Sequence, residues 1–337
     1  MKRIVYFDVQ EDEFDFLKRH NENKYDYYLT DKSLNNIEKI PENLRNADII
    51  SCFTTSRIDK KVLKQFTHLK LIALRSVGFN HVDIDYCRKN KICVVNTPNY
   101  GNKSVAEFAF GLMLDINRKI THSYINLKNG KIIPKSSMGN ELYKKTIGIV
   151  GLGAIGEAFA NLAYGFNMHI LAYDLKEKKE LKTKYNIKYT DFDTLLNQSD
   201  FISIHAPLTK TTYHMFNEKN LNKMKNSAFL INTARGELID TQALFNSLIQ
   251  NKIAGAALDV LESEETITDD DYLIDINRLN NDVLKQTILN TKLQQLENVI
   301  ITPHIAYNTH EAINRILETT MFNINTFIKG HIKNSVY

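Results

Sequence analysis

The chain has 337 residues, a length at which a polypeptide usually divides into two domains rather than extending one core. Its 43 basic and 39 acidic residues leave a net charge of +4 and are interspersed, so the composition argues against a nucleic-acid-binding face. The first apolar run ends at Asp8, too early for a signal peptide, and no run approaches the roughly 18 to 20 residues of a membrane span. The three cysteines lack metal-ligand spacing, so we expect a cytoplasmic protein without a metal or a membrane partner.

The first hundred residues alternate short apolar runs with polar stretches of helical character. The apolar runs at 4–8, 49–53, 71–73 and 92–95 predict strands, and helices between them predict a parallel sheet. From residue 102 to 119, apolar side chains recur at helical spacing, which predicts a long helix leading into a second domain.

The second half contains six apolar runs that each end in polar residues. These predicted strands span residues 146–150, 169–173, 201–204, 229–231, 254–258 and 299–301. Ligands of open α/β sheets bind at the carboxyl ends of the strands, so the polar residues that follow should meet in one crevice. An amphipathic helix predicted at 309–327 should pack back on the first domain.

A glycine motif follows the first of these strands. Gly151, Gly153 and Gly156 have the spacing of the dinucleotide fingerprint, in which the glycines permit a tight turn, close approach of the pyrophosphate and close helix packing. Asp174 ends the next strand, where a carboxylate binds ribose hydroxyls and repels a 2′-phosphate. The pattern predicts NAD rather than NADP as the cofactor.

Hydride transfer to a keto acid needs a cation for the carboxylate, an acid for the carbonyl oxygen and a group that keeps that acid protonated. Arg235 can bind a carboxylate bidentately, and His304 is an acid suited to neutral pH. The third group lies in an acidic run, where spacing does not distinguish Glu262, Glu264 and Glu265.

Several ordered motifs extend this pattern over nearly the whole chain. They are RSVGFNHVD at 75–83, NTPNY at 96–100, SVAE at 104–107, HAPLT at 205–209, NTARG at 232–236, ALDV at 257–260 and TPHIA at 302–306. With the glycine motif, they resemble the D-isomer-specific 2-hydroxyacid dehydrogenase family, most closely its D-lactate dehydrogenases.

The resemblance implies a role for individual residues. Arg235 would bind the substrate carboxylate and carbonyl, and His304 would donate a proton as hydride arrives. Glu264, rather than its acidic neighbours, would hydrogen-bond the His304 ring and raise its pKa. Backbone amides of Val77 and Gly78 would bind the carboxylate from the first domain. The residues expected to line the substrate pocket are Phe53, Tyr100 and Tyr307, and those expected at the cofactor are Gly151, Gly153, Ala154, Ile155, Gly156, Asp174, His205, Ala206, Pro207, Thr233, Ala234 and Asp259.

The predicted fold is α/β, with a doubly wound Rossmann NAD-binding domain inserted into a flavodoxin-like substrate domain. We expect the first at residues 101–303 and the second at 1–100 and 304–337. By resemblance, the helix at 102–119 implies a homodimer contact, and the long interval between Glu264 and His304 implies a cleft rim or subunit contact.

The function predicted from these residues and the resemblance is NAD-dependent reduction of pyruvate to D-lactate. One alternative is a dehydrogenase for larger branched or aryl 2-keto acids. An alternative of another class is an NAD-sensing, corepressor-like interaction protein. Formate dehydrogenases of the family usually carry glutamine at the position of Glu264, and the pocket motifs lack the arginine cluster that phosphoglycerate would require.

Overall fold

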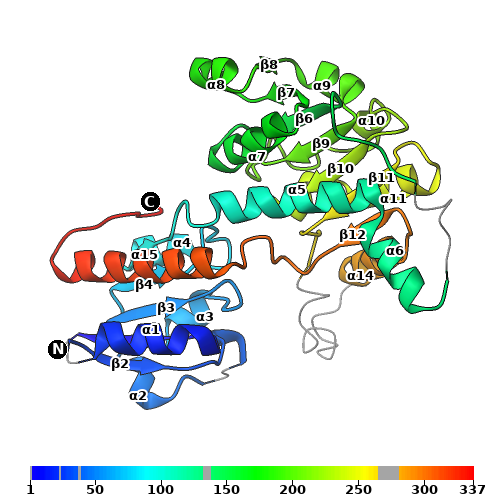
Figure 1. Cartoon of the computed structure of the whole chain (residues 1–337). Coiled ribbons are helices and arrows are strands. Elements are labelled where there is room, and N and C mark those ends of the chain that lie inside the picture. The colour runs from blue at the N-terminus through cyan, green and yellow to red at the C-terminus, as the bar shows by residue number, and fades with distance from the viewer. Residues whose placement is uncertain (1, 23, 37–38, 132–137, 265–280) are drawn as a thin grey trace. The chain divides into compact units, whose positions relative to one another are not determined.

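The computed structural model describes residues 2–22, 24–36, 39–131, 138–264 and 281–337. The chain forms two compact units, Met1–Tyr100 with Thr309–Tyr337, and Gly101–Asn308 (Figure 1). Among the described helices, none is long and apolar enough to cross a membrane. The first part of the predicted long interval, residues 265–280, lies outside the described residues.

The first unit is built on a five-stranded sheet in the order β2-β1-β3-β4-β5, and every pairing is parallel. This is the flavodoxin-like order. The strands are β1 (Arg3–Tyr6), β2 (Asp26–Leu29), β3 (Ile49–Cys52), β4 (Leu71–Leu74) and β5 (Cys93–Val95). The helices are α1 (Glu11–Asn21), α2 (Glu42–Arg45), α3 (Lys60–Leu63), α4 (Ile84–Lys89) and α15 (His310–Ile328), with a 3-10 turn η1 (Leu34–Asn36).

Helices cover both faces of this sheet, because alternate strand residues point to opposite faces and both sets are apolar. Ile4 and Tyr6 of β1 pack with Leu17 of α1 and Met321 of α15 on one face. Val5 packs on the other face in a core that includes side chains from α2, α3 and α4. The C-terminal helix thus packs on the first sheet, as its amphipathic pattern predicted.

The first sheet contains one strand that the apolar runs did not predict. β2 has the sequence Asp26-Tyr27-Tyr28-Leu29, and its residues alternate between exposed and half-buried at the edge of the sheet. An edge strand with one partner needs no continuous apolar run, so hydrophobic patterning does not reveal it.

The second unit contains a seven-stranded parallel sheet in the order β12-β11-β10-β9-β6-β7-β8. This is the Rossmann order, with the strand order reversing between β6 and β9. The strands are β6 (Thr146–Val150), β7 (His169–Tyr173), β8 (Ile187–Tyr189), β9 (Phe201–Ile204), β10 (Phe229–Asn232), β11 (Gly255–Leu258) and β12 (Val299–Ile301). The six predicted strands are present; β8, a three-residue edge strand, was not predicted.

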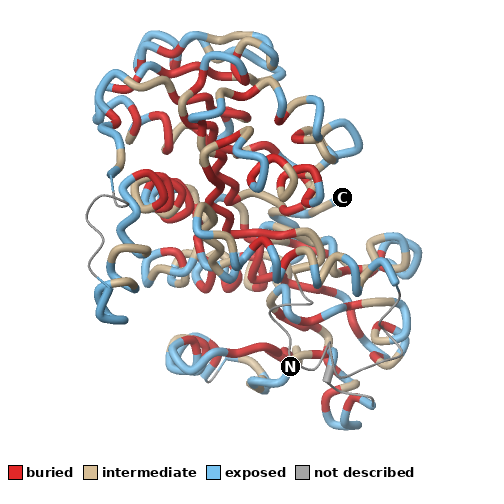
Figure 2. Tube along the Cα trace, turned by 90° about the vertical axis from the view of Figure 1, so that its right-hand side faces the viewer, coloured by how far each residue is buried: buried red, intermediate tan, exposed pale blue. Residues whose placement is uncertain are grey.

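Two apolar cores sandwich the second sheet. The helices of this unit are α5 (Asn102–Arg118), α6 (Ile120–Lys128), α7 (Ala154–Gly165), α8 (Lys179–Lys184), α9 (Phe192–Gln198), α10 (Glu218–Leu221), α11 (Thr241–Ile249) and α14 (Asn281–Gln294), with a 3-10 turn η3 (Gly236–Leu238). Helices α5 and α7 pack on one face, while α9, α11 and α14 contribute to the core on the other. Figure 2 shows the buried strands in red.

Candidate active site

The loop after β6 is shaped by two glycines. Gly151 has a φ of +91°, and a Cβ there would lie 2.8 Å from the backbone nitrogen of Ala206, in the loop after β9. A Cβ at Gly156 would lie 2.1 Å from the carbonyl oxygen of Gly151. The loops of the two strands at the reversal point therefore meet closely, and α7 packs against the turn that precedes it.

The start of α7 suits a dinucleotide pyrophosphate. A Cβ at Gly153, the residue that caps the helix, would meet no described atom within 4 Å, so the space beside it is open. No side chain caps the N-terminus of this 12-residue helix, whose first turn includes Ala154 and Ile155. Its N–H groups and helix dipole favour a phosphate anion at this point.

Asp174, directly after β7, is held beside the glycine loop. Its Oδ2 accepts a hydrogen bond from the backbone N–H of Leu152 at 2.6 Å, and its Oδ1 accepts one from Lys176 N–H at 2.9 Å. A carboxylate has about four acceptor positions, so this anchoring leaves capacity for ribose hydroxyls. Lys178 Nζ donates to the carbonyl oxygen of Leu152 at 2.7 Å, which places a cation on the same loop.

The residue directly after each of the neighbouring strands β9 and β10 has a buried polar atom that lacks a hydrogen-bond partner among the described residues. These atoms are His205 Nδ1 and Thr233 Oγ1. The other ring nitrogen of His205 lies 3.0 Å from Ser203 Oγ, and burial lowers the pKa of the imidazole to about 3, so it is neutral. Buried polar groups are normally satisfied, and here a bound cofactor would supply the missing partners.

Three further residues predicted at the cofactor lie in these same strand-end loops. Ala206 is buried and Pro207 exposed after β9, and the carbonyl of Ala234 after β10 accepts a hydrogen bond from Arg235 Nη1 at 2.6 Å. With the open space at Gly153, the anchored Asp174 and the two unpartnered atoms, the residues present fit NAD.

The loop carrying Arg235 is held by its own strand. Asn232, the last residue of β10, donates from Nδ2 to the carbonyl oxygen of Arg235 at 2.8 Å and accepts from Ala234 N–H at 3.0 Å. A Cβ at Gly236 would lie 2.0 Å from the carbonyl carbon of Leu261. The absence of a side chain there lets the loop after β10 touch the turn that follows β11.

That turn carries Glu264, whose Oε1 lies 2.6 Å from His304 Nδ1. Burial by itself lowers the pKa of His304, but the Glu264 hydrogen bond and the negative charges of Glu264 and Asp259 outweigh burial and the opposing charge of Arg235. The pKa therefore lies above its usual value. His304 is thus suited to hold a proton near neutral pH.

Contacts distinguish the glutamates that spacing left equivalent. Glu262 is hydrogen-bonded to Thr241 and His214, whereas Glu264 is hydrogen-bonded to His304. Glu265 lies outside the described residues.

Asp259, predicted at the cofactor, holds the loop that carries His304. Its carboxylate accepts hydrogen bonds from Thr302 Oγ1 at 2.5 Å, Ile305 N–H at 3.0 Å and Ala306 N–H at 2.8 Å. Its backbone carbonyl accepts from His304 N–H at 2.9 Å, and burial raises the pKa of its side chain. Within the described residues, the Asp259 side chain hydrogen-bonds and so fixes the loop that carries His304.

The residues predicted to bind substrate divide between the units. Phe53, Val77, Gly78 and Tyr100 belong to the first unit, and Tyr307 belongs to the second. In the first unit, Asn96 Nδ2 donates to the carbonyl of Val77 at 2.8 Å, and Ser76 Oγ donates to that of Gly78 at 2.7 Å. Both carbonyls are therefore hydrogen-bonded to side chains of the first unit. These bonds fix the loop of Val77 and Gly78, whose backbone amides are predicted to bind the substrate.

Sequence reasoning named no role for several residues that shape these loops. Asn232, Thr302 and Asn96 each hydrogen-bond the backbone or side chain of a predicted site residue. All three stand inside the motifs that carry the resemblance, and that position was the available signal. Their partners depend on which loops meet in space, so a linear pattern could not identify them.

The sheet is doubly wound, its glycine turn fits a pyrophosphate, and an acid-base pair lies at neighbouring strand ends. Together these features define an NAD-dependent oxidoreductase. Residues 110–306 match the model of the D-isomer specific 2-hydroxyacid dehydrogenase NAD-binding domain. The chain belongs to this family, so the predictions of fold, family and NAD as cofactor are confirmed.

Known proteins are similar to this chain in sequence over most of its length. A glyoxylate reductase from Thermofilum pendens is 40% identical over 300 residues, covering 88% of this chain and 82% of that protein. A D-lactate dehydrogenase from Escherichia coli is 33% identical over 338 residues and covers 98% of each. The crystal structure of Aquifex aeolicus D-lactate dehydrogenase with NAD and lactic acid has a TM-score of 0.86 and 34% identity, covering 99% of this chain and 98% of that one.

Proposed function

We propose that this dehydrogenase reduces pyruvate to D-lactate with NADH. The observation that carries the proposal is the His304–Glu264 pair at 2.6 Å, in the same unit as the NAD site and beside the loop that bears Arg235. Similarity to D-lactate dehydrogenases over nearly the full chain supports pyruvate as the substrate.

The residues of the chain have separate tasks in this reaction. When bound, NADH would supply the hydride that the carbonyl carbon accepts. Arg235 binds the substrate carboxylate through its planar guanidinium, and the protonated His304 donates its proton to the carbonyl oxygen. Glu264 holds the ring in place and stabilises its charged form. A proton from solvent restores His304 after the hydroxy acid leaves.

We assign Val77, Gly78, Phe53 and Tyr100 of the first unit to substrate binding. We assign NAD to the second unit, which also carries Arg235, His304 and Tyr307. Backbone N–H groups of Val77 and Gly78 would bind the substrate carboxylate, as expected from the family resemblance. Phe53, Tyr100 and Tyr307 would surround the substituent on the keto carbon. Three aromatic walls favour a small apolar group such as the methyl of pyruvate.

Glyoxylate is a second candidate, because a glyoxylate reductase is 40% identical to this chain. Glyoxylate carries hydrogen where pyruvate carries methyl, so the two differ in one small apolar contact. Such a difference changes kcat/KM by about 10- to 200-fold at most. Larger branched and aryl keto acids test whether the same aromatic residues accept a substituent bigger than methyl.

The decisive assay measures kcat/KM with NADH and NADPH for pyruvate, glyoxylate, hydroxypyruvate, a branched-chain 2-keto acid and phenylpyruvate. We expect pyruvate to rank first, NADH to be preferred and the product to be D-lactate on chiral chromatography. A higher kcat/KM for glyoxylate would replace the substrate, and L-lactate would contradict the stereochemical proposal. Tight NADH binding without reduction of any acid would favour an NAD-sensing interaction protein.

We also propose that the protein acts in the cytoplasm as a homodimer with α5 at the contact. Sedimentation equilibrium measures the mass directly. A mass of one chain, 38.9 kDa, at micromolar concentration would contradict the dimer.

A further inference from the structure

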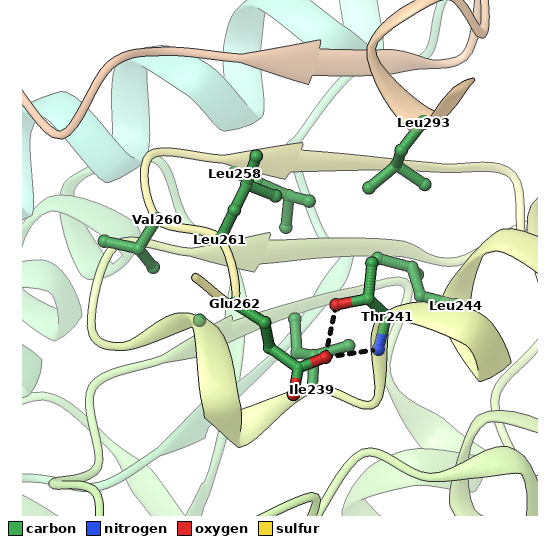
Figure 3. A pocket seen from close by; sticks show the side chains of 9 residues that line it. Ile239, Thr241, Leu244, Leu258, Val260, Leu261, Glu262 and Leu293 are labelled. Carbon is green, nitrogen blue, oxygen red and sulfur yellow. Dashed lines mark hydrogen bonds between the residues drawn. The ribbon is translucent and has the colours of Figure 1, made fainter. Parts of the chain in front are cut away.

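The Glu262 carboxylate joins three separate segments of the NAD-binding unit. Its Oε2 accepts hydrogen bonds from the backbone N–H of Thr241 at 3.0 Å and from Thr241 Oγ1 at 2.5 Å (Figure 3). Its Oε1 lies 2.6 Å from His214 Nε2. Thr241 begins α11, His214 lies in the loop after β9, and Glu262 lies in the turn after β11. The Glu262 side chain thus connects the turn after β11 with the start of α11 and with the loop after β9.

The surroundings favour this arrangement. The carboxylate borders a small cavity whose other walls are mostly aliphatic, formed by Ile239, Leu244, Leu258, Val260, Leu261 and Leu293 (Figure 3). A charge in such surroundings is costly unless it is hydrogen-bonded, so its three contacts resist displacement. The backbone carbonyl of Glu262 also accepts a hydrogen bond from Asn290 Nδ2 at 2.9 Å.

The anchored turn carries the partner of the proton donor. Glu264 stands two residues beyond Glu262, and its Oε2 accepts from the N–H of Leu261 at 3.3 Å while its Oε1 reaches His304 Nδ1 at 2.6 Å. Leu261 directly precedes Glu262, so the anchor and the catalytic contact share one short turn. A shift of about 1 Å in such a turn is enough to weaken a catalytic contact considerably.

We propose that Glu262, clamped by Thr241 and His214, is a positioning residue that sets Glu264 against His304. This inference rests on the proposed function, in which His304 is the proton donor. Glu262 contacts neither reacting group in the described structure, and it acts through the turn that it shares with Glu264.

The test compares Glu262→Ala with Glu262→Gln. Alanine removes all three contacts. Glutamine keeps them, because its oxygen accepts from Thr241 and its amide N–H donates to His214 in the tautomer whose Nε2 is an acceptor. Glu218→Ala, an exposed glutamate on α10, is the matched control. We expect kcat to fall about 10-fold in Glu262→Ala, and to stay within about twofold of wild type in the other two variants.

Two readouts separate positioning from a general loss of structure. In Glu262→Ala, the descending limb of the pH profile for keto-acid reduction should move to lower pH, while the dissociation constant of NADH stays within about twofold. An unchanged pH profile in a folded Glu262→Ala protein would overturn the inference. So would equal weakening of NADH binding and catalysis. If Glu262→Ala does not fold, Thr241→Val removes one of the three contacts, and its pH profile decides in the same way.

The proposal of a keto-acid reductase and this inference can fail separately. Imidazole NMR titration of His304, assigned with a His304→Asn sample, measures its pKa without turnover. A wild-type protein that reduces no keto acid would refute the proposed function, whereas a His304 titration that is the same in wild type and Glu262→Ala would refute the positioning role.

Discussion

The two units are both built on a parallel sheet but differ in the side chains at their strand ends. In the second unit, the loops at the strand ends carry ionisable side chains, among which His304 has its pKa raised by Glu264 and Asp259 against the effect of burial. In the first unit, Arg75, which directly follows β4, is completely buried. Its Nη2 donates to the carbonyls of Phe7 and Asp8, both at 2.7 Å, so it joins β4 to the end of β1.

This difference supports the proposed separation of proton transfer from substrate placement. The first unit presents backbone groups on a loop that follows Arg75, and Asn96 and Ser76 fix two carbonyls of that loop. Removing a support there should alter the binding of the keto acid. In the second unit, changes at Arg235 should alter carboxylate binding, and changes at Glu264 and His304 should alter the chemical step and its pH dependence. Substitutions in each unit can therefore test the proposed division of roles.

The largest effect is expected for His304→Asn. His304 has a φ of +53°, a conformation that asparagine tolerates well, so the loop should keep its shape. Loss of the general acid should lower kcat by about 10² to 10⁴-fold with little change in NADH affinity. Stopped-flow reduction and NADH fluorescence titration measure the two quantities. Wild-type turnover in this variant would remove His304 from the mechanism.

Arg235→Lys should have the next largest effect. Lysine keeps the charge but cannot bind a carboxylate through two parallel N–H groups, so kcat/KM for pyruvate should fall about 100-fold. Initial-rate kinetics and the inhibition constant of oxamate, a pyruvate analogue, provide the measurement. Comparable kinetics of the lysine variant would show that bidentate binding is not used.

Glu264→Gln should change the pH dependence. Reduction requires protonated His304, so activity is present below its pKa and is lost as pH rises through it. Because Glu264 raises that pKa, glutamine should move the loss to lower pH, with turnover about 10-fold lower above neutrality and closer to wild type in acid. The profile of kcat/KM against pH measures this shift, and a limb that does not move would contradict the pairing.

The smallest effect should come from the first unit. Asn96→Ala removes the hydrogen bond to the Val77 carbonyl, which contributes about 1 kcal/mol. The KM for pyruvate should rise about fivefold, while kcat and the affinity for NADH are retained. Asn325→Ala is a matched control, because it also removes an asparagine hydrogen bond within this unit, to Tyr25. A fall in kcat with an unchanged KM would abolish the proposed division between the units.

Much of the fold could be predicted because buried parallel strands leave continuous apolar runs. The runs at 146–150 and 169–173 coincide with β6 and β7, and the helix predicted at 102–119 ends one residue earlier, where Lys119 adopts a left-handed conformation. Strands β2 and β8 were missed because they are short, partly polar edges that are stabilised by pairing with a neighbour.

The dinucleotide turn and the candidate acid and cation could be predicted from the sequence, because glycine spacing and residues at strand ends are local properties of the chain. The contacts that these groups make depend on how the chain folds. Glu262 and Glu264 are equivalent in the linear pattern, yet one reaches Thr241 and His214 and the other reaches His304. The physical reason is the meeting of loops from separate strands, which Gly236 permits by having no side chain where the turn after β11 passes.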